Sequence, residues 1–392
     1  MKSLVFIIVS SLSVGLFGQS ITEIISHVYE NTLETMLKEL TGEVSTVVNG
    51  NSVTILNRES NQNDLAKDFI VERLSNLNNI TVTTDAYSTN GTNIIATQAG
   101  TSNPNNVVVI CAHYDSVANY CADDNATGTI AVLEVARILS AYCFDYTIQY
   151  VLFDEEEDGL VGSQHFVNTF DSAHNLIGAI NLDMMGYDRD QANDAPIHVQ
   201  DSGNSYALKD SAVSVLNTYN AEIESTPNVI DPGIEASDHF YFWFGGRTAI
   251  MISDASSFED LTPHYHTADD RVSTLDLPYY YNMVRFLLAI TASTAEVSAT
   301  QDCSNLSNPT NKANQGVQIF PNPAGEYVII TLPNNRSSEA SVGFYNILGE
   351  LIYQQELTEI KTQIDLARFY NGVYFVKVKN DKETITKKLI VD

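Results

Sequence analysis

Short apolar runs alternate with stretches of helical period through most of the chain. The runs Val107–Ile110, Tyr146–Phe153, Ile177–Asp183 and Thr248–Ile252 are typical of buried strands. Apolar residues at helical spacing predict helices at Ile24–Leu40, Leu65–Leu74, Thr129–Leu139, Ser205–Tyr219 and Pro278–Ala295. Two further strands are predicted at Ile80–Thr84 and Thr92–Thr97. Strands that alternate with helices predict an α/β fold with a mostly parallel central sheet and helices on both faces.

The hydrophobic pattern changes near Gln301. Residues 301–316 are rich in Ser, Asn and Thr, as linkers are. Beyond them, short alternating segments separated by turn residues predict a small all-β sandwich domain. Its strands are expected at Val317–Phe320, Tyr327–Leu332, Ser341–Asn346, Leu351–Gln355, Gln363–Leu366, Val373–Lys379 and Thr384–Val391. We therefore expect one domain at residues 19–300, a linker at 301–316 and a second domain at 317–392.

Residues 1–18 have the features of a secretory signal peptide. Lys2 precedes an apolar run from Leu4 to Phe17, and the small residue Gly18 follows. The run is short and is interrupted by serines and a glycine, so it would span a membrane poorly. The sequence thus predicts a secreted protein with no membrane span in its mature form. Whether residues 21–51 form a removable propeptide stays open.

The chain is strongly acidic, with 49 Asp and Glu against 20 Lys and Arg and a formal net charge of -29. This balance argues against a nucleic-acid partner, because phosphate binding needs a basic surface. The four cysteines include no Cys-x-x-Cys pair, so a thiolate metal site is not indicated. Cys111 is expected to be a buried thiol, and export would permit a Cys121–Cys143 disulfide.

Acidic residues and histidines gather just beyond the predicted strands, where ligands of open α/β sheets bind. In chain order they are His113, Asp115, Asp123, Asp124, Asp154–Asp158, Asp183, His264 and His266. Consecutive carboxylates repel one another, and a bound cation would offset that repulsion directly. Imidazole and carboxylate ligands favour Zn²⁺, with Mn²⁺ and Co²⁺ as alternatives. The carboxylates exceed what one zinc ion needs, which favours a two-metal centre.

These residues resemble the motifs of the di-zinc aminopeptidases related to bacterial leucyl aminopeptidase, over roughly Ile24–Ala295. The matching segments are His113-Tyr-Asp115, Ala122-Asp-Asp-Asn-Ala-Thr-Gly128, Glu156-Glu-Asp-Gly-Leu-Val-Gly-Ser163, Asn181-Leu-Asp-Met-Met-Gly186, Ser237-Asp-His-Phe240 and Tyr265-His-Thr267. Asp154 and Glu155 extend the usual Glu pair, but Gly159 and Gly162 fix its register on Glu156 and Glu157.

The resemblance implies two zinc ions per chain, held by His113, Asp124, Glu157, Asp183 and His266, with Asp124 as the bridging ligand. Glu156 would be the general base that acts on a metal-bridged hydroxide. Asp115 would orient the imidazole of His113, and Tyr265 would donate to the developing oxyanion. The implied activity is a secreted zinc exopeptidase that removes N-terminal residues from peptide substrates.

Other readings stay open at this point. A glutaminyl cyclase or a carboxypeptidase would have the same fold, and a non-catalytic binding protein would keep the fold without turnover. Cyclases that resemble this fold use one zinc ion, whereas the full ligand set favours two. His239 is expected to be a structural or pocket-wall histidine, and His264 a solvated one.

The C-terminal segment resembles the type IX secretion sorting domain of exported bacterial proteins. The matching features are Ile319-Phe-Pro-Asn-Pro323, Asn346-Ile-Leu-Gly349, Leu366-Ala-Arg-Phe-Tyr-Asn-Gly-Val-Tyr374 and Lys387-Lys-Leu-Ile390. The resemblance implies that the type IX secretion machinery is a partner. The alternative is a carbohydrate-binding or adhesive sandwich, which the absence of Trp from this segment weakens.

Overall fold

The computed structural model describes residues 21–59, 62–298, 318–320, 322, 324–325, 327–332, 340–346, 350–357, 361–379 and 384–391. The predicted signal peptide at residues 1–18 and the predicted linker at 301–316 lie outside these residues. The chain divides into two compact units, Met1–Leu306 and Ser307–Asp392. The domain limits expected at residues 300 and 317 stay predictions.

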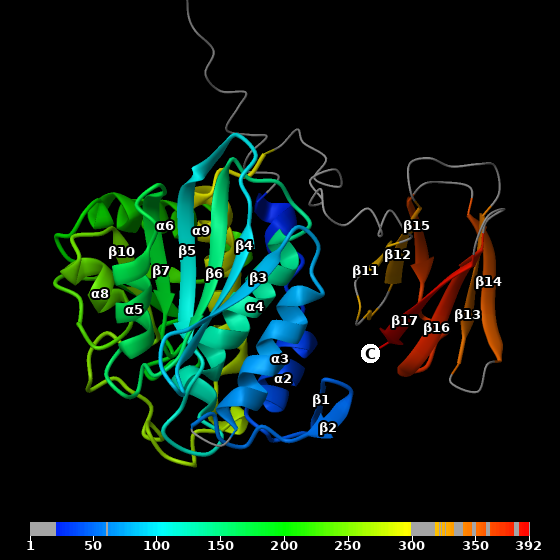
Figure 1. Cartoon of the computed structure of the whole chain (residues 1–392), viewed down its shortest axis with the longest axis horizontal. Coiled ribbons are helices and arrows are strands. Elements are labelled where there is room, and N and C mark those ends of the chain that lie inside the picture. The colour runs from blue at the N-terminus through cyan, green and yellow to red at the C-terminus, as the bar shows by residue number, and fades with distance from the viewer. Residues whose placement is uncertain are drawn as a thin grey trace, which may run out of the picture. The chain divides into compact units, whose positions relative to one another are not determined.

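The larger unit is built on an eight-stranded sheet of order β3-β4-β6-β5-β7-β10-β8-β9 (Figure 1). These strands are β3 Thr81–Ala86, β4 Thr92–Gln98, β5 Asn103–His113, β6 Tyr146–Phe153, β7 Asn175–Leu182, β8 Asp194–His198, β9 Thr226–Ile230 and β10 Ala249–Ile252. Strands β6, β5, β7 and β10 are parallel neighbours at its centre, whereas β3, β4 and β8 pair antiparallel with their inner neighbours. The sheet is therefore mixed, with the predicted parallel arrangement in the middle.

Helices cover both faces of this sheet, as predicted (Figure 1). They are α2 Glu30–Leu40, α3 Asn63–Ser75, α4 Gly128–Leu139, α5 Val161–Thr169, α6 Ser205–Thr218, α7 Asn220–Ile223, α8 His239–Phe244 and α9 Leu277–Thr294. Short turns η1 Ala122–Thr127 and η2 Val272–Thr274 and a small hairpin of β1 Thr46–Val48 and β2 Asn51–Val53 complete this unit within the described residues.

The central strand β5 is buried on both sides from Val107 onward, which explains its apolar run Val107–Ala112. Val108 and Ile110 point into the larger core, beneath α2, α3, α4 and α9. Val109 and Cys111 point into the smaller core with α5 and α8. Because side chains on both faces of β5 pack into a hydrophobic core, the position of its last residue, His113, is fixed by that packing.

The sequence did not predict strands β8 and β9. Both are short and contain a proline, Pro196 in β8 and Pro227 in β9, and β9 is the edge strand. Proline lacks the donor that a central strand needs, so a pattern search assigns such segments to loops. Pairing with β10 and with each other defines these two strands.

The smaller unit confirms the predicted all-β region. It has a three-stranded sheet of β11 Gln318–Phe320, β12 Tyr327–Thr331 and β15 Lys361–Asp365. A four-stranded sheet contains β13 Ala340–Tyr345, β14 Leu351–Leu357, β16 Gly372–Lys379 and β17 Thr384–Val391. Alternate residues of the strands form one apolar core, which includes Val328, Val342 and Val376.

The predicted Cys121–Cys143 disulfide is wrong. Cys121 is a buried free thiol beside the left-handed turn before η1, and Cys143 is disulfide-bonded without it. Spacing in the sequence could not show this, because the direction of each side chain depends on the fold. Cys111 is a buried free thiol, as expected. Within the described residues, no helix combines the length and apolar character needed to cross a membrane.

Candidate metal centre

The carboxyl ends of three parallel strands bring the acidic segments together. β5 ends at His113, which pairs in register with Phe153, the last residue of β6. The acidic run therefore begins beside the histidine. β7 ends at Leu182, and Asp183 is the next residue. Parallel strands present their carboxyl ends at one edge of the sheet, so three distant segments supply side chains to one place.

Three groups of three side chains are arranged as metal ligands could be, and two of them share Asp124. In the first, Nε2 of His113 lies 3.4 Å from Asp124 Oδ1 and 3.5 Å from Asp183 Oδ1. In the second, Nε2 of His266 lies 3.1 Å from Asp124 Oδ2 and 3.2 Å from Glu157 Oε2. Within each group the potential ligand atoms all lie within 4.8 Å of one another. All five predicted ligands are thus in these two groups.

Asp124 belongs to both groups and presents a different oxygen to each. Its side chain is only 4% exposed, so it has little access to bulk water. A carboxylate that faces two ligand groups with separate oxygens has the geometry of a bridging ligand. Asp123, the other acid of the pair, accepts a hydrogen bond from the N–H of Gly186 at 2.8 Å, which turns it away from the two groups.

Glu156 lies beside the first group without completing it. Its Oε2 is 3.9 Å from Nε2 of His113, farther than the carboxylates of Asp124 and Asp183. It also forms a possible ligand group with His113 and Glu157. Burial raises the pKa of Glu156 well above its usual range. A carboxyl whose pKa is raised toward the working pH can exchange a proton with a neighbouring group in both directions.

Asp115 contacts two predicted ligands. One carboxylate oxygen lies 3.3 Å from Nδ1 of His113, and the other accepts the backbone N–H of Glu157 at 3.1 Å. The first contact leaves Nε2 of the imidazole free to face Asp124 and Asp183. Outer carboxylates commonly orient ligand histidines in this way. Asp115 is therefore placed for the orienting role that the sequence predicted.

The acidic run separates into supporting and site-facing residues. Asp154 is buried and accepts hydrogen bonds from Asn63 at 2.7 Å, the N–H of Thr92 at 2.9 Å and the hydroxyl of Tyr114 at 2.8 Å. Burial raises the pKa of Asp154 to about 6. Glu155 has a positive φ of 53° and accepts from Ser88 at 3.4 Å. Only the next two glutamates, Glu156 and Glu157, lie within the candidate ligand groups, and the register deduced from the glycines stays a prediction.

The donor set fits a pair of divalent cations. Glu157 Oε1 is buried and makes no hydrogen bond within the described residues, and Nε2 of His113 faces the carboxylates of Asp124 and Asp183. Although burial by itself would lower it, the pKa of His113 is raised well above normal by the carboxylates of Glu156 and Asp183. Excess carboxylate around buried imidazole is costly unless a cation compensates. Nitrogen and oxygen ligands without cysteine suit Zn²⁺.

The stability of the metal-free protein is expected to fall as pH rises from about 6.5 to 8. Burial raises the pKa of Glu157 to about 8 and those of Asp238 and Asp254 to about 7. In this interval these groups are protonated in the folded chain more than in the unfolded chain, so ionisation costs stability. Burial lowers the pKa values of His198 and His239 to about 4 and 3. These two histidines make stability rise with pH, but only below their usual pKa of 6.5.

Thermal unfolding at both ends of this interval, with chelator and with zinc, measures the effect. The melting temperature should fall with pH in chelator and should fall less with zinc, because bound cations favour the ionised carboxylates. A chelated protein whose melting temperature rises with pH would contradict the electrostatic description.

Tyr265 stacks on the ring of His266, with centroids 3.7 Å apart, so its ring lies beside the second ligand group. Burial raises the pKa of Tyr265, which keeps the phenol protonated as a donor. His239 is buried, contacts the carbonyl of Ile234 at 2.8 Å through Nε2 and packs edge-on against Trp243. It is therefore structural, as expected. His264 is half-buried and lies outside the ligand groups.

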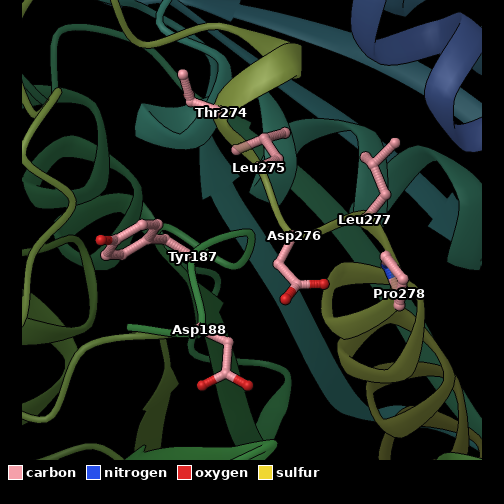
Figure 2. A pocket seen from close by; sticks show the side chains of 7 residues that line it. All are labelled: Tyr187, Asp188, Thr274, Leu275, Asp276, Leu277 and Pro278. Carbon is pink, nitrogen blue, oxygen red and sulfur yellow. The ribbon is translucent and has the colours of Figure 1, made fainter. Parts of the chain in front are cut away.

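A separate pocket of about 470 Å³ lies where the chain leaves the site after Gly186 (Figure 2). It is lined by Tyr187, Asp188 and the segment 274–278, and no predicted ligand contributes to it. Asp188 accepts the N–H of Asn193 at 3.0 Å, so this carboxylate stabilises its own loop.

Two residues around the site were not predicted. Asp270 accepts hydrogen bonds from the backbone N–H groups of Asp123 and Asp124. Arg58 donates to three backbone carbonyls in the segment between β5 and η1. Asp270 lies four positions beyond His266, in a segment that the sequence had singled out, and was assigned no role. Nothing in the sequence around Arg58 indicates that its guanidinium is buried, because its partners are backbone atoms 56 to 63 positions away.

An α/β sheet that gathers histidines and carboxylates at the ends of its parallel strands is typical of metal-dependent hydrolases. The model of peptidase family M28 matches residues 93–291, which include all of the predicted ligands. The chain belongs to this family, which confirms the resemblance that the motifs indicated. A secretion system C-terminal sorting domain model matches residues 318–392.

Curated relatives carry peptidase names. Aminopeptidase YwaD of Bacillus subtilis (strain 168) is 30% identical over 170 residues, which cover 42% of this chain and 36% of the relative. A probable leucine aminopeptidase of Trichophyton verrucosum (strain HKI 0517) is 31% identical over 203 residues, covering 48% and 53%. The chain thus spans about a third to a half of the length of these relatives.

Solved structures show the same fold at low sequence identity. The LapA aminopeptidase of Legionella pneumophila superposes with a TM-score of 0.61 at 18% identity, covering 76% of this chain and 78% of LapA. A glutaminyl cyclase of Porphyromonas gingivalis gives a TM-score of 0.50 at 18% identity, covering 68% and 98%. Aminopeptidase and cyclase therefore share this architecture, and the fold alone does not distinguish between them.

Proposed function

We propose that this protein is an exported aminopeptidase that uses two zinc ions to hydrolyse the first peptide bond of its substrates. The observation that carries the proposal is the pair of ligand groups that share Asp124, with Glu156 beside them. The aminopeptidase names of relatives at about 30% identity support the choice of reaction. The second ligand group favours a two-metal peptidase over a one-zinc cyclase.

His113 and Asp183 would hold one zinc ion, Glu157 and His266 would hold the other, and Asp124 would contact both. When bound, the ions would polarise the scissile carbonyl and lower the pKa of a water molecule. That is the chemistry that the cofactor supplies, and the protein supplies the position and protonation state of the groups around it.

Proton transfer is the part assigned to Glu156. Its carboxylate would accept a proton from the attacking water and deliver it to the nitrogen of the leaving amine. The raised pKa of Glu156 suits both steps, because a more basic carboxylate takes the proton more readily. The hydroxyl of Tyr265 would donate to the carbonyl oxygen as negative charge develops there.

Export is proposed from the two ends of the chain. The C-terminal sorting domain indicates delivery to the cell surface or the extracellular space. We propose that the type IX secretion machinery recognises residues 317–392 after residues 1–18 have directed the chain out of the cytoplasm.

The test is metal content together with product analysis on the purified full chain. Two zinc ions per chain, release of single N-terminal residues, loss of release with chelator and recovery with zinc are the expected results. One zinc ion with cyclisation of N-terminal glutamine would replace the proposal with a cyclase. Zinc binding without any turnover would contradict it in favour of a binding protein.

A further inference from the structure

The loop that leads into the bridging aspartate has a strained backbone. Tyr120 and Cys121 are consecutive non-glycine residues with positive φ values of 70° and 43°. L-residues in the left-handed region cost free energy and persist only when surrounding contacts determine them. Asp124 follows three positions later, in an irregular turn with φ of -104° and ψ of 92°. The position of its carboxylate therefore depends on whatever holds this loop.

Arg58 holds the carbonyl side of the loop. Its side chain is fully buried and donates to the carbonyls of Tyr120 at 2.7 Å and Cys121 at 2.8 Å, the two residues with positive φ. Its Nε donates to the carbonyl of Tyr114 at 2.9 Å, which ties the loop to the end of β5. A guanidinium presents donors in a rigid fork, so it can fix several carbonyls at once where a lysine cannot.

Asp270 holds the N–H side of the same loop. Its carboxylate accepts the backbone N–H of Asp123 at 2.9 and 3.0 Å and that of Asp124 at 3.0 Å. Its own carbonyl accepts the N–H of Ala122 at 3.1 Å. Its N–H donates to the carbonyl of Thr267 at 3.2 Å, immediately after His266. Asp270 thus connects the loop of the bridging carboxylate to the loop of the last predicted ligand.

We propose that Arg58 and Asp270 are positioning residues that hold the Tyr120–Asp124 loop and so place Asp124 for both metal ions, and that Asp270 in addition sets the spacing between Asp124 and His266. The proposal rests on the two-metal site proposed above. Asp270 acts on the Asp124–Glu157–His266 group because it touches both loops of that group. Arg58 acts on both groups through Asp124, because it fixes the loop as a whole.

Zinc affinity of the full-length chain tests the role of Asp270. Asp270→Ala should weaken binding of the zinc ion in the Asp124–Glu157–His266 group by about 10- to 100-fold and should weaken binding of the other ion less, because that ion shares only Asp124 with the loops that Asp270 contacts. Asp270→Asn keeps one acceptor oxygen, so its zinc affinity should lie between that of Asp270→Ala and that of the wild type. Asp269→Ala removes the same charge from the exposed neighbouring residue and should bind both ions normally. The visible spectrum of the Co²⁺-loaded variants reports the ligand geometry independently of turnover.

A second pair of variants distinguishes a loss of folding stability from a loss of metal-ligand positioning. Arg58→Met should weaken binding of both zinc ions. The control, Arg137→Met, removes a guanidinium that is paired with buried Glu134 on α4, away from the ligand groups. Arg137→Met should therefore lower the melting temperature without changing zinc affinity. If Asp270→Ala and folded Arg58→Met lower only the melting temperature and bind both ions normally, the clamp is overturned.

The same samples separate this inference from the proposed function. Wild-type protein that binds two zinc ions but releases no N-terminal residues would contradict the aminopeptidase, while the zinc affinities would still decide the clamp. An active wild type whose Asp270→Ala variant binds zinc normally would contradict the clamp alone. A wild type that binds no zinc would overturn both.

Discussion

Glu156→Gln is expected to abolish hydrolysis of N-terminal residues while the protein keeps both zinc ions. The substitution preserves the size of the side chain but removes the carboxylate that accepts a proton from water. Loss of a general base costs about 10²- to 10⁴-fold in rate. Glu156 lies farther from His113 Nε2 than the ligand carboxylates do, so zinc content should stay at the wild-type value. Turnover of an amino-acyl anilide and metal analysis of the same sample measure both quantities.

Glu155→Gln is the matched control, because it makes the same change one position earlier. Glu155 lies outside the ligand groups and its side chain contacts Ser88, so activity should stay near that of the wild type. If Glu155→Gln is inactive and Glu156→Gln is active, the register of the acidic run is wrong by one residue. If Glu156→Gln is purified without metal, Glu156 is a ligand, and the assignment of the base fails.

Asp124→Ala is expected to weaken the binding of both zinc ions and to abolish hydrolysis of N-terminal residues. Its two oxygens face separate ligand groups, so one substitution deletes a ligand from each. The loss of affinity should exceed the roughly 10- to 100-fold that replacing an outer partner of a ligand costs. Zinc raises the melting temperature only because it binds the folded chain. The increase in melting temperature that zinc causes in the wild type should therefore disappear in Asp124→Ala. Metal titration and thermal unfolding with and without zinc check this outcome.

His266→Ala is the comparison for Asp124→Ala, since His266 belongs to a single ligand group. It should keep one zinc ion and lose the other. Equal zinc loss in the two variants would show that Asp124 does not bridge. Full retention of two ions by Asp124→Ala would show that the ligand groups have been assigned incorrectly.

Local sequence determined most of the secondary structure and the chemistry of the site. The strand Tyr146–Phe153 was predicted with the bounds that the structure has, because its mostly apolar, β-branched and aromatic residues suit a sheet covered on both faces. The residue types beyond these strands indicated zinc, because imidazole and carboxylate without cysteine match its preferences. Gly159 and Gly162 gave the register of the glutamates, and Gly159 has a φ of 108° that other residues rarely adopt.

Tertiary structure decided what depends on contacts between distant residues. The free thiol of Cys121, the pairing of β8 with β10 and the different contacts of Asp123 and Asp124 follow from the way the assembled sheet brings distant segments together. Arg58 and Asp270 gain their roles from backbone groups far away in the chain, which no local pattern encodes. A sequence can thus reveal which groups are able to bind metal, whereas only the fold brings their atoms to ligand distances, because those distances are set by packing across the whole sheet.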